Sequence, residues 1–166
     1  MNYLIRSVLL LSIIIMANSI ESQAGPAESR CSDVNTITVE DWRTWAQVTS
    51  KPVRSEGHSN NWVGIFVDER AKDTYLNAGA RYPVCARVVK AIYENADGTS
   101  VRKLTVMIKM TPGYDPGNGD WWYASFDEAG KQVWQQGRLP GCILCHRQAA
   151  ETDYLFSKDV LEALKK

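Results

Sequence analysis

Apolar residues gather in short runs separated by turn residues over the central part of the chain, a pattern that predicts β-strands. We expect five strands, at residues 62–67, 83–95, 101–110, 121–126 and 131–134. Asp97-Gly98, between the second and third strands, is the strongest short-range hairpin signal. Residues 127–130 turn the last two strands into a second hairpin. The Pro- and Gly-rich stretch 111–120 between the hairpins predicts a loop.

Apolar residues at helical spacing predict helices on either side of these strands. A capping-box pattern at residues 38–41 opens a helix over residues 39–48. Residues 68–78 form a second short helix, with Gly79 as its carboxyl-terminal cap. An amphipathic helix over residues 153–165 closes the chain. Its apolar stripe would bury Tyr154, Leu155, Val160, Leu161 and Leu164. This order predicts an α+β fold, a mainly antiparallel sheet with short flanking helices.

The amino terminus has the organisation of a secretory signal peptide. Arg6 supplies a short positive region, and the apolar run at residues 8–16 falls short of the ~20 residues that a membrane span needs. Residues 22–24 (SQA) form a cleavage site, so residues 1–24 are predicted to be removed. The alternative is an uncleaved amino-terminal anchor. A cleaved signal predicts a periplasmic or secreted protein without stable membrane insertion.

Composition narrows the classes of partner. Lysine plus arginine number 19, as do aspartate plus glutamate, so no net charge steers the protein towards nucleic acid or an anionic membrane. Residues 25–166 suffice for one domain with a single core.

Residues 142–146 (CILCH) form a C-x-x-C-H run, the attachment signal of a c-type haem. Cys142 and Cys145 would each bond one haem vinyl group, and His146 would ligate the iron. A C-x-x-C redox pair would require a surrounding βαβ pattern, which is missing here. A zinc site would need a second ligand pair, and the other histidine, His58, has no cysteine beside it. The motif therefore predicts haem c, covalently bound, one per chain.

Cys31 and Cys85 remain after the haem motif is set aside. In an oxidising compartment two leftover thiols most simply form a disulfide. Sequence does not establish that their Cα atoms approach closely enough, so the pairing stays open at this point.

The motif lies close to the end of the chain, behind a β-rich region. Small electron-carrying cytochromes c are mostly helical and carry the motif near their beginning. Here the sheet, rather than a helical shell, is expected to supply the distal wall of the haem pocket.

The ordered motifs of this chain resemble those of the cytochrome P-460 family and the related cytochromes c′-β. They are WVGIFVD at 62–68 with Ala71, GARYP at 79–83, VVK at 88–90, LTVMIK at 104–109, WWY at 121–123 and CILCH at 142–146. The resemblance implies a mainly antiparallel β domain, often a homodimer. It also implies one haem whose single protein axial ligand matches His146, with five-coordinate iron.

In the P-460 enzymes a strand lysine is bonded to a meso carbon of the haem, and Lys90 matches that position. Lys90 is the lone cation in an apolar row, which favours a haem-facing side chain. A three-residue hairpin loop would place Leu104 and Val106 across from it. A two-residue loop would pair it with Thr105 on a solvated face, because one residue of slip reverses the face. The family usually has glycine at Cys85 and an acid at Ala91, differences that concern the lysine bond more than the haem.

Further ligand candidates are less specific. His58 could ligate iron or relay protons, although a loop histidine is more often a surface residue. Met107 and Met110 could supply a sixth ligand in an electron carrier, or pack as core. Asp153 could shuttle protons near the haem or serve as a helix amino-terminal charge. Arg87 could approach a haem propionate.

The resemblance implies hydroxylamine oxidation to products at the level of nitrous or nitric oxide. Lys90 would tune the haem, and the electrons would pass to a soluble acceptor such as a cytochrome c. A non-enzymatic protein that binds nitric oxide, as cytochromes c′-β do, is the first alternative. An electron-transfer cytochrome is the second.

Overall fold

The computed structural model describes residues 31, 33–79 and 81–165. The expected signal peptide at residues 1–24 lies outside them, so its removal stays a prediction. The described residues form a seven-stranded antiparallel sheet, in which the order is β1-β3-β4-β5-β6-β7 and β2 also pairs with β3. The strands are β1 Ala46–Gln47, β2 Val53–Ser55, β3 Asn61–Val67, β4 Arg87–Tyr93, β5 Val101–Lys109, β6 Trp121–Phe126 and β7 Val133–Gly137. The predicted α+β class with a mainly antiparallel sheet is confirmed.

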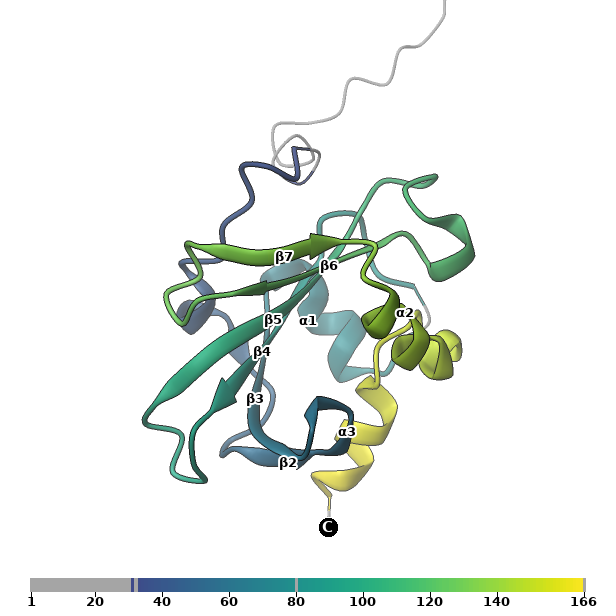
Figure 1. The fold of residues 1–166 in the computed structure, drawn as a ribbon. Helices are drawn as coiled ribbons and strands as arrows, with labels where there is room; N and C mark the ends of the chain where they lie inside the picture. The colour runs from purple at the N-terminus through teal and green to yellow at the C-terminus, as the bar shows by residue number, and fades with distance from the viewer. Residues whose placement is uncertain (1–30, 32, 80, 166) are drawn as a thin grey trace, which may run out of the picture.

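Short helices accompany the sheet, and Figure 1 shows α2 and α3 beside it, with α3 near the carboxyl terminus. The α-helices are α1 Glu69–Leu76, α2 Pro140–His146 and α3 Ser157–Ala163. The 3₁₀ turns are η1 Trp42–Thr44, η2 Glu56–His58, η3 Pro116–Asn118 and η4 Arg147–Thr152. Among the residues that the structure describes, no helix has the length and apolar character to cross a membrane.

The sheet is buried on both faces, because successive side chains of a strand point to opposite sides. Val88 of β4 packs on what we call the helix face, with apolar residues of α1, α2 and α3. Val89 packs on the opposite face, with Cys31 and apolar residues of 34–45 from the amino-terminal segment. The strands therefore carry two hydrophobic cores, and the haem motif belongs to the helix face.

The helix predicted at residues 39–48 is wrong. One 3₁₀ turn forms at Trp42–Thr44, and Ala46–Gln47 then pair with β3 as β1. Trp42 packs into the core of the opposite face, whereas Ala46 and Val48 pack against that of the helix face. The segment passes from one face of the sheet to the other, and a continuous helix would have kept its apolar stripe on one side.

Helix α1 confirms the second predicted helix. The Asp68 side chain caps its amino terminus by accepting a hydrogen bond from Ala71 N at 2.9 Å. The left-handed residue at its end is Ala78, with φ 48°, rather than the expected Gly79. Gly79 N donates to Thr74 O instead, and a Cβ at Gly79 would lie 2.8 Å from Thr74 Cγ2. Glycine is needed there for close approach.

The closing helix is shorter than predicted. Residues 147–152 form η4, and Asp153 and Tyr154 are both left-handed, so α3 begins only at Ser157. Leu155 is buried as expected, but Leu164 is exposed. Two consecutive left-handed residues cannot belong to a right-handed helix.

Cys31 and Cys85 form a disulfide, with a Cα–Cα distance of 5.6 Å. The bond ties the amino-terminal segment to the residues just before β4. Cys85 itself has φ 67°, which ends the extended conformation, and β4 therefore starts at Arg87 rather than at residue 83.

The disulfide closes a sequence separation of 54 residues. Replacing both cysteines by alanine is expected to lower the free energy of unfolding by about 4 kcal/mol, because the unfolded chain gains conformational freedom. Cys31→Ala with Cys85→Gly should lose about 1 kcal/mol less, because glycine adopts a positive φ without strain. Guanidinium unfolding followed by circular dichroism measures both variants. A double-alanine variant as stable as the native protein would contradict the expectation.

Candidate functional site

The C-x-x-C-H motif lies on α2, which starts with Pro140 in its first turn. Positions three and four apart share one side of a helix, so Cys142, Cys145 and His146 lie together. Both motif thiols are free and half-buried, in contrast to the disulfide-bonded Cys31 and Cys85.

The His146 imidazole is buried and oriented. Its Nδ1 lies 2.6 Å from the Tyr154 carbonyl oxygen, so Nδ1–H donates and Nε2 keeps a lone pair. The rings of Tyr123 and Phe156 each lie 5.5 Å from the imidazole, between centroids. Burial lowers the pKa of His146 to about 4, the Tyr154 hydrogen bond opposes this shift, and the Lys90 charge reinforces it. The imidazole is therefore neutral at pH 7, the form that binds metals.

Lys90 pairs with Ile65 on β3 and with Thr105 on β5. The sequence analysis expected Lys90 to face solvent if it paired with Thr105. It does pair with Thr105, but its side chain does not lie on a solvated face, so that expectation is wrong. Lys90 is half-buried on the helix face, in line with Val88. Burial lowers the pKa of its amine to about 8, and the nearby Cys145 thiol opposes that shift. Lys90 and the motif thus share one side of the sheet.

The turn η2 brings a further segment to the motif. A Cβ built on Gly57 would lie 3.6 Å from Cys145 Sγ, so the turn packs directly against this thiol. The adjacent His58 is half-buried. Burial lowers the pKa of His58 to about 3, and the charge of Lys90 makes the next largest contribution. His58 is therefore a neutral imidazole beside the motif rather than a surface residue.

Three residues around His146 were not predicted from the sequence as part of the site. Tyr123 and Phe156 flank His146, and Tyr154 supplies its hydrogen-bond acceptor. Of these three, only Tyr123 belonged to a motif of the family pattern, the WWY run at residues 121–123. Burial raises the pKa of the Cys142 thiol and the neighbouring Cys145 raises it further, whereas Lys103, on the helix face of β5, opposes the shift.

The other candidate residues are engaged in core packing or in ion pairs. Met107 packs in the core of the helix face and Met110 in that of the opposite face. Asp153 is buried and paired with Lys109, so it is not a helix amino-terminal charge. Arg87 projects to the opposite face, three residues from Lys90 along the strand.

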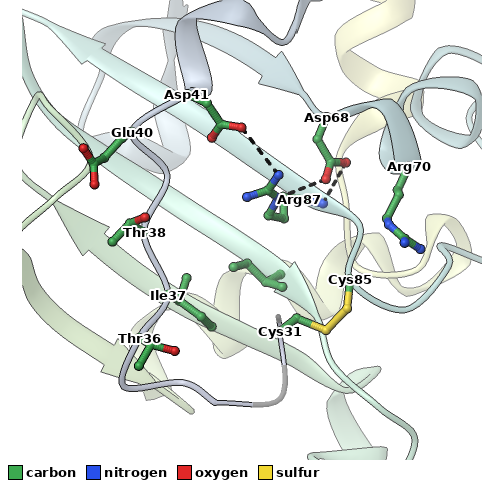
Figure 2. Close-up of a pocket in the computed structure, with 11 residues that line it drawn as sticks. Cys31, Thr36, Ile37, Thr38, Glu40, Asp41, Asp68, Arg70, Cys85 and Arg87 are labelled. Carbon is green, nitrogen blue, oxygen red and sulfur yellow. Dashed lines mark hydrogen bonds and ion pairs between the residues drawn. A yellow bond between two sulfur atoms is a disulfide. The ribbon is translucent and has the colours of Figure 1, made fainter. Parts of the chain in front are cut away.

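Arg87 contributes to a cleft of about 560 Å³ beside the Cys31–Cys85 disulfide. Figure 2 shows its guanidinium between Asp41 and Asp68. The Arg87 Nε–Asp68 Oδ2 distance is 3.0 Å, and the guanidinium carbon lies 4.5 Å from the centre of the Trp45 ring. These interactions join η1, α1 and β4, so this cleft has a structural explanation and is separate from the motif.

The residues around the motif fit a haem. Two free thiols, a neutral imidazole with Nε2 available and the Lys90 amine come from α2 and the facing sheet. The buried Tyr123 hydroxyl has no hydrogen-bond partner in the described part of the chain. Within that same part, no three His, Cys, Asp or Glu side chains group closely enough to hold a metal ion. An iron porphyrin needs only one protein ligand, whereas a zinc site needs at least three.

Comparison with known proteins gives the same answer. A sequence model of the family described as Cytochrome P460 matches residues 39–157, which include all seven strands and the haem motif. No curated protein matched the chain. The match covers most of the chain, and the fold agrees with the resemblance noted from its motifs. The chain therefore belongs to the cytochrome P460 family and is a haem-binding cytochrome.

Proposed function

We propose that this protein is an exported mono-haem c-type cytochrome that oxidises hydroxylamine. Cys142 and Cys145 hold the haem through thioether bonds, and His146 is the single axial ligand of five-coordinate iron. The observation that carries the proposal is the neutral, buried His146, whose Nδ1 is bonded to Tyr154 O and whose Nε2 is available. It lies on the same turn of helix as two free thiols.

The haem supplies the vacant iron position and the redox chemistry, and the chain orients and shields it. Two hydroxylamine molecules yield nitrous oxide and water, with four electrons and four protons released. The electrons pass to a soluble acceptor such as a cytochrome c, and the domain works in the periplasm, where it can form a homodimer. Tyr123 and Phe156 exclude water from the imidazole. The half-buried Lys90 lies on the same face of the sheet as the motif, and its charge interacts with the Cys145 thiol, which supports a bond between the Lys90 amine and the haem edge.

Nitric oxide binding without turnover is the second candidate function. Three fully buried apolar side chains share the helix face with Lys90, namely Val63, Ile65 and Ile92. A crowded apolar wall suits a small uncharged gas better than it suits hydroxylamine. An electron carrier is the third candidate function. Of its two possible methionine ligands, Met110 packs on the opposite face from the motif, whereas Met107 packs in the core of the helix face.

Covalent attachment is tested by variants of the two cysteine pairs. When the protein is made with a competent haem-maturation system, haem should remain on the chain after acid–acetone extraction. Cys142→Ser/Cys145→Ser should lose the haem, because both thioether bonds are removed. Cys31→Ser/Cys85→Ser is the matched control and should keep it. A colourless native protein would contradict the proposal.

Absorption spectroscopy and a turnover assay separate the candidate functions. The ferrous P-460-type enzyme should show a Soret band shifted far to the red, and hydroxylamine should reduce an added electron acceptor. A normal five-coordinate high-spin spectrum without turnover would favour the nitric oxide binder. A sharp low-spin α band would indicate two strong axial ligands and overturn five-coordination.

Peptide mapping by mass spectrometry tests the third covalent bond. In a protease digest, the peptide that contains Lys90 should remain joined through the haem to the peptide of residues 142–146. Lys90→Ala should release it and return the Soret band to a normal position. Lys103→Ala is the control, because Lys103 lies on the next strand of the same face. A freely released Lys90 peptide from native protein would leave the thioether bonds as the only attachment.

A further inference from the structure

The acceptor of the His146 hydrogen bond belongs to a turn of unfavourable conformation. Asp153 and Tyr154 have φ values of 52° and 67°, both left-handed. Residues other than glycine rarely adopt this conformation, although aspartate tolerates it better than tyrosine does. The turn directs the Tyr154 carbonyl to His146 Nδ1 at 2.6 Å. Surrounding interactions must hold the turn in this geometry.

Three segments of the sheet region hold Asp153. Lys109 Nζ, at the end of β5, lies 2.6 Å from each of its carboxylate oxygens. Tyr82 N donates to Asp153 Oδ2 at 2.8 Å, and Trp121 Nε1 donates to Asp153 O at 2.7 Å. The Lys109 and Asp153 side chains are only 12% and 9% exposed, so water competes weakly for this ion pair.

The Tyr154 side of the turn is also fixed. A Cβ at Gly119 would lie 2.4 Å from the Tyr154 ring, so only glycine leaves room for this ring. Gly119 has φ 71°, which glycine adopts without strain. Tyr154 N donates to Ala149 O at 2.8 Å. Tyr154 therefore has little freedom to move its carbonyl away from His146.

We propose that Lys109 and Asp153 are positioning residues for the axial ligand. Their ion pair holds the Tyr154 carbonyl against His146 Nδ1–H, and this hydrogen bond increases the electron donation of the imidazole to iron. The inference rests on one part of the proposed function, iron ligation by His146. It does not depend on which substrate binds the opposite side of the haem.

Lys109 and Asp153 could affect the haem through their charges alone or by positioning the Tyr154 carbonyl, and the two explanations predict different shifts of the reduction potential. Through charge alone, removal of the Lys109 cation would lower the reduction potential, and removal of the Asp153 anion would raise it. Through positioning, either removal weakens the same hydrogen bond. Both variants then weaken the iron–histidine bond and raise the potential, because a less basic imidazole stabilises ferric iron less.

Resonance Raman spectroscopy of the ferrous holoprotein, together with potentiometric titration, tests this inference. Lys109→Met removes the cation. Asp153→Asn keeps the shape and tolerates a left-handed backbone. The double variant Lys109→Met/Asp153→Asn leaves the local charge unchanged. Lys131→Met is the control, because Lys131 forms an exposed ion pair with Glu40 at 3.2 Å.

The iron–histidine stretching band should move to lower frequency in both single variants and in the double variant, and the potential should rise in all three. The control should change neither quantity. The inference would be overturned if the two single variants shifted the reduction potential in opposite directions and left the iron–histidine band unchanged. If Lys109→Met does not accumulate, the band position in Asp153→Asn decides. A native protein without an iron–histidine band would overturn His146 ligation, and this inference with it.

Discussion

The hydrogen bond between His146 Nδ1 and the Tyr154 carbonyl is the interaction on which the candidate site depends. It fixes the tautomer, so the nitrogen that can bind iron is Nε2, and it fixes the ring between Tyr123 and Phe156. An imidazole without this partner could rotate about its side-chain bonds. The surrounding sheet supplies the constraint indirectly, because three of its neighbouring segments hold the turn that contains the acceptor.

The double-sided sheet explains how so small a domain can support a buried group. The amino-terminal segment covers the opposite face, and the disulfide fastens it to the residues before β4. The helix face is then free to carry the motif and Lys90 without leaving the strands exposed to water. The opposite face therefore contributes mainly to stability, whereas the helix face carries the residues of the candidate site. The ion pair of Arg87 and Asp68 joins the two sides where α1 meets β4.

Short-range signals were sufficient for much of this architecture. The Asp97-Gly98 hairpin, the second hairpin and the helix after Asp68 follow from turn chemistry and local pattern. Residues 39–48 were wrongly predicted as a helix because their apolar side chains pack in two different cores. A single hydrophobic period describes only one buried side. The burial of Lys90 could not be predicted from its strand register, because the segments that cover this face, α2 and η2, are distant in sequence. The left-handed turn at Asp153 was equally hidden, since its partners lie on β5, on β6 and at Tyr82, all distant in sequence.

The position of the motif also affects the order in which the site is completed. All seven strands precede α2 along the chain, whereas the Tyr154 carbonyl and the Phe156 ring, which contact the imidazole, follow it. A chain emerging during synthesis therefore presents a complete set of strands first, then the thiols, and only afterwards the Asp153–Tyr154 turn. The histidine is accessible before its orientation is locked. If haem is attached as proposed, the attaching enzymes would meet a histidine that is not yet oriented, and the Asp153–Tyr154 turn would orient it afterwards.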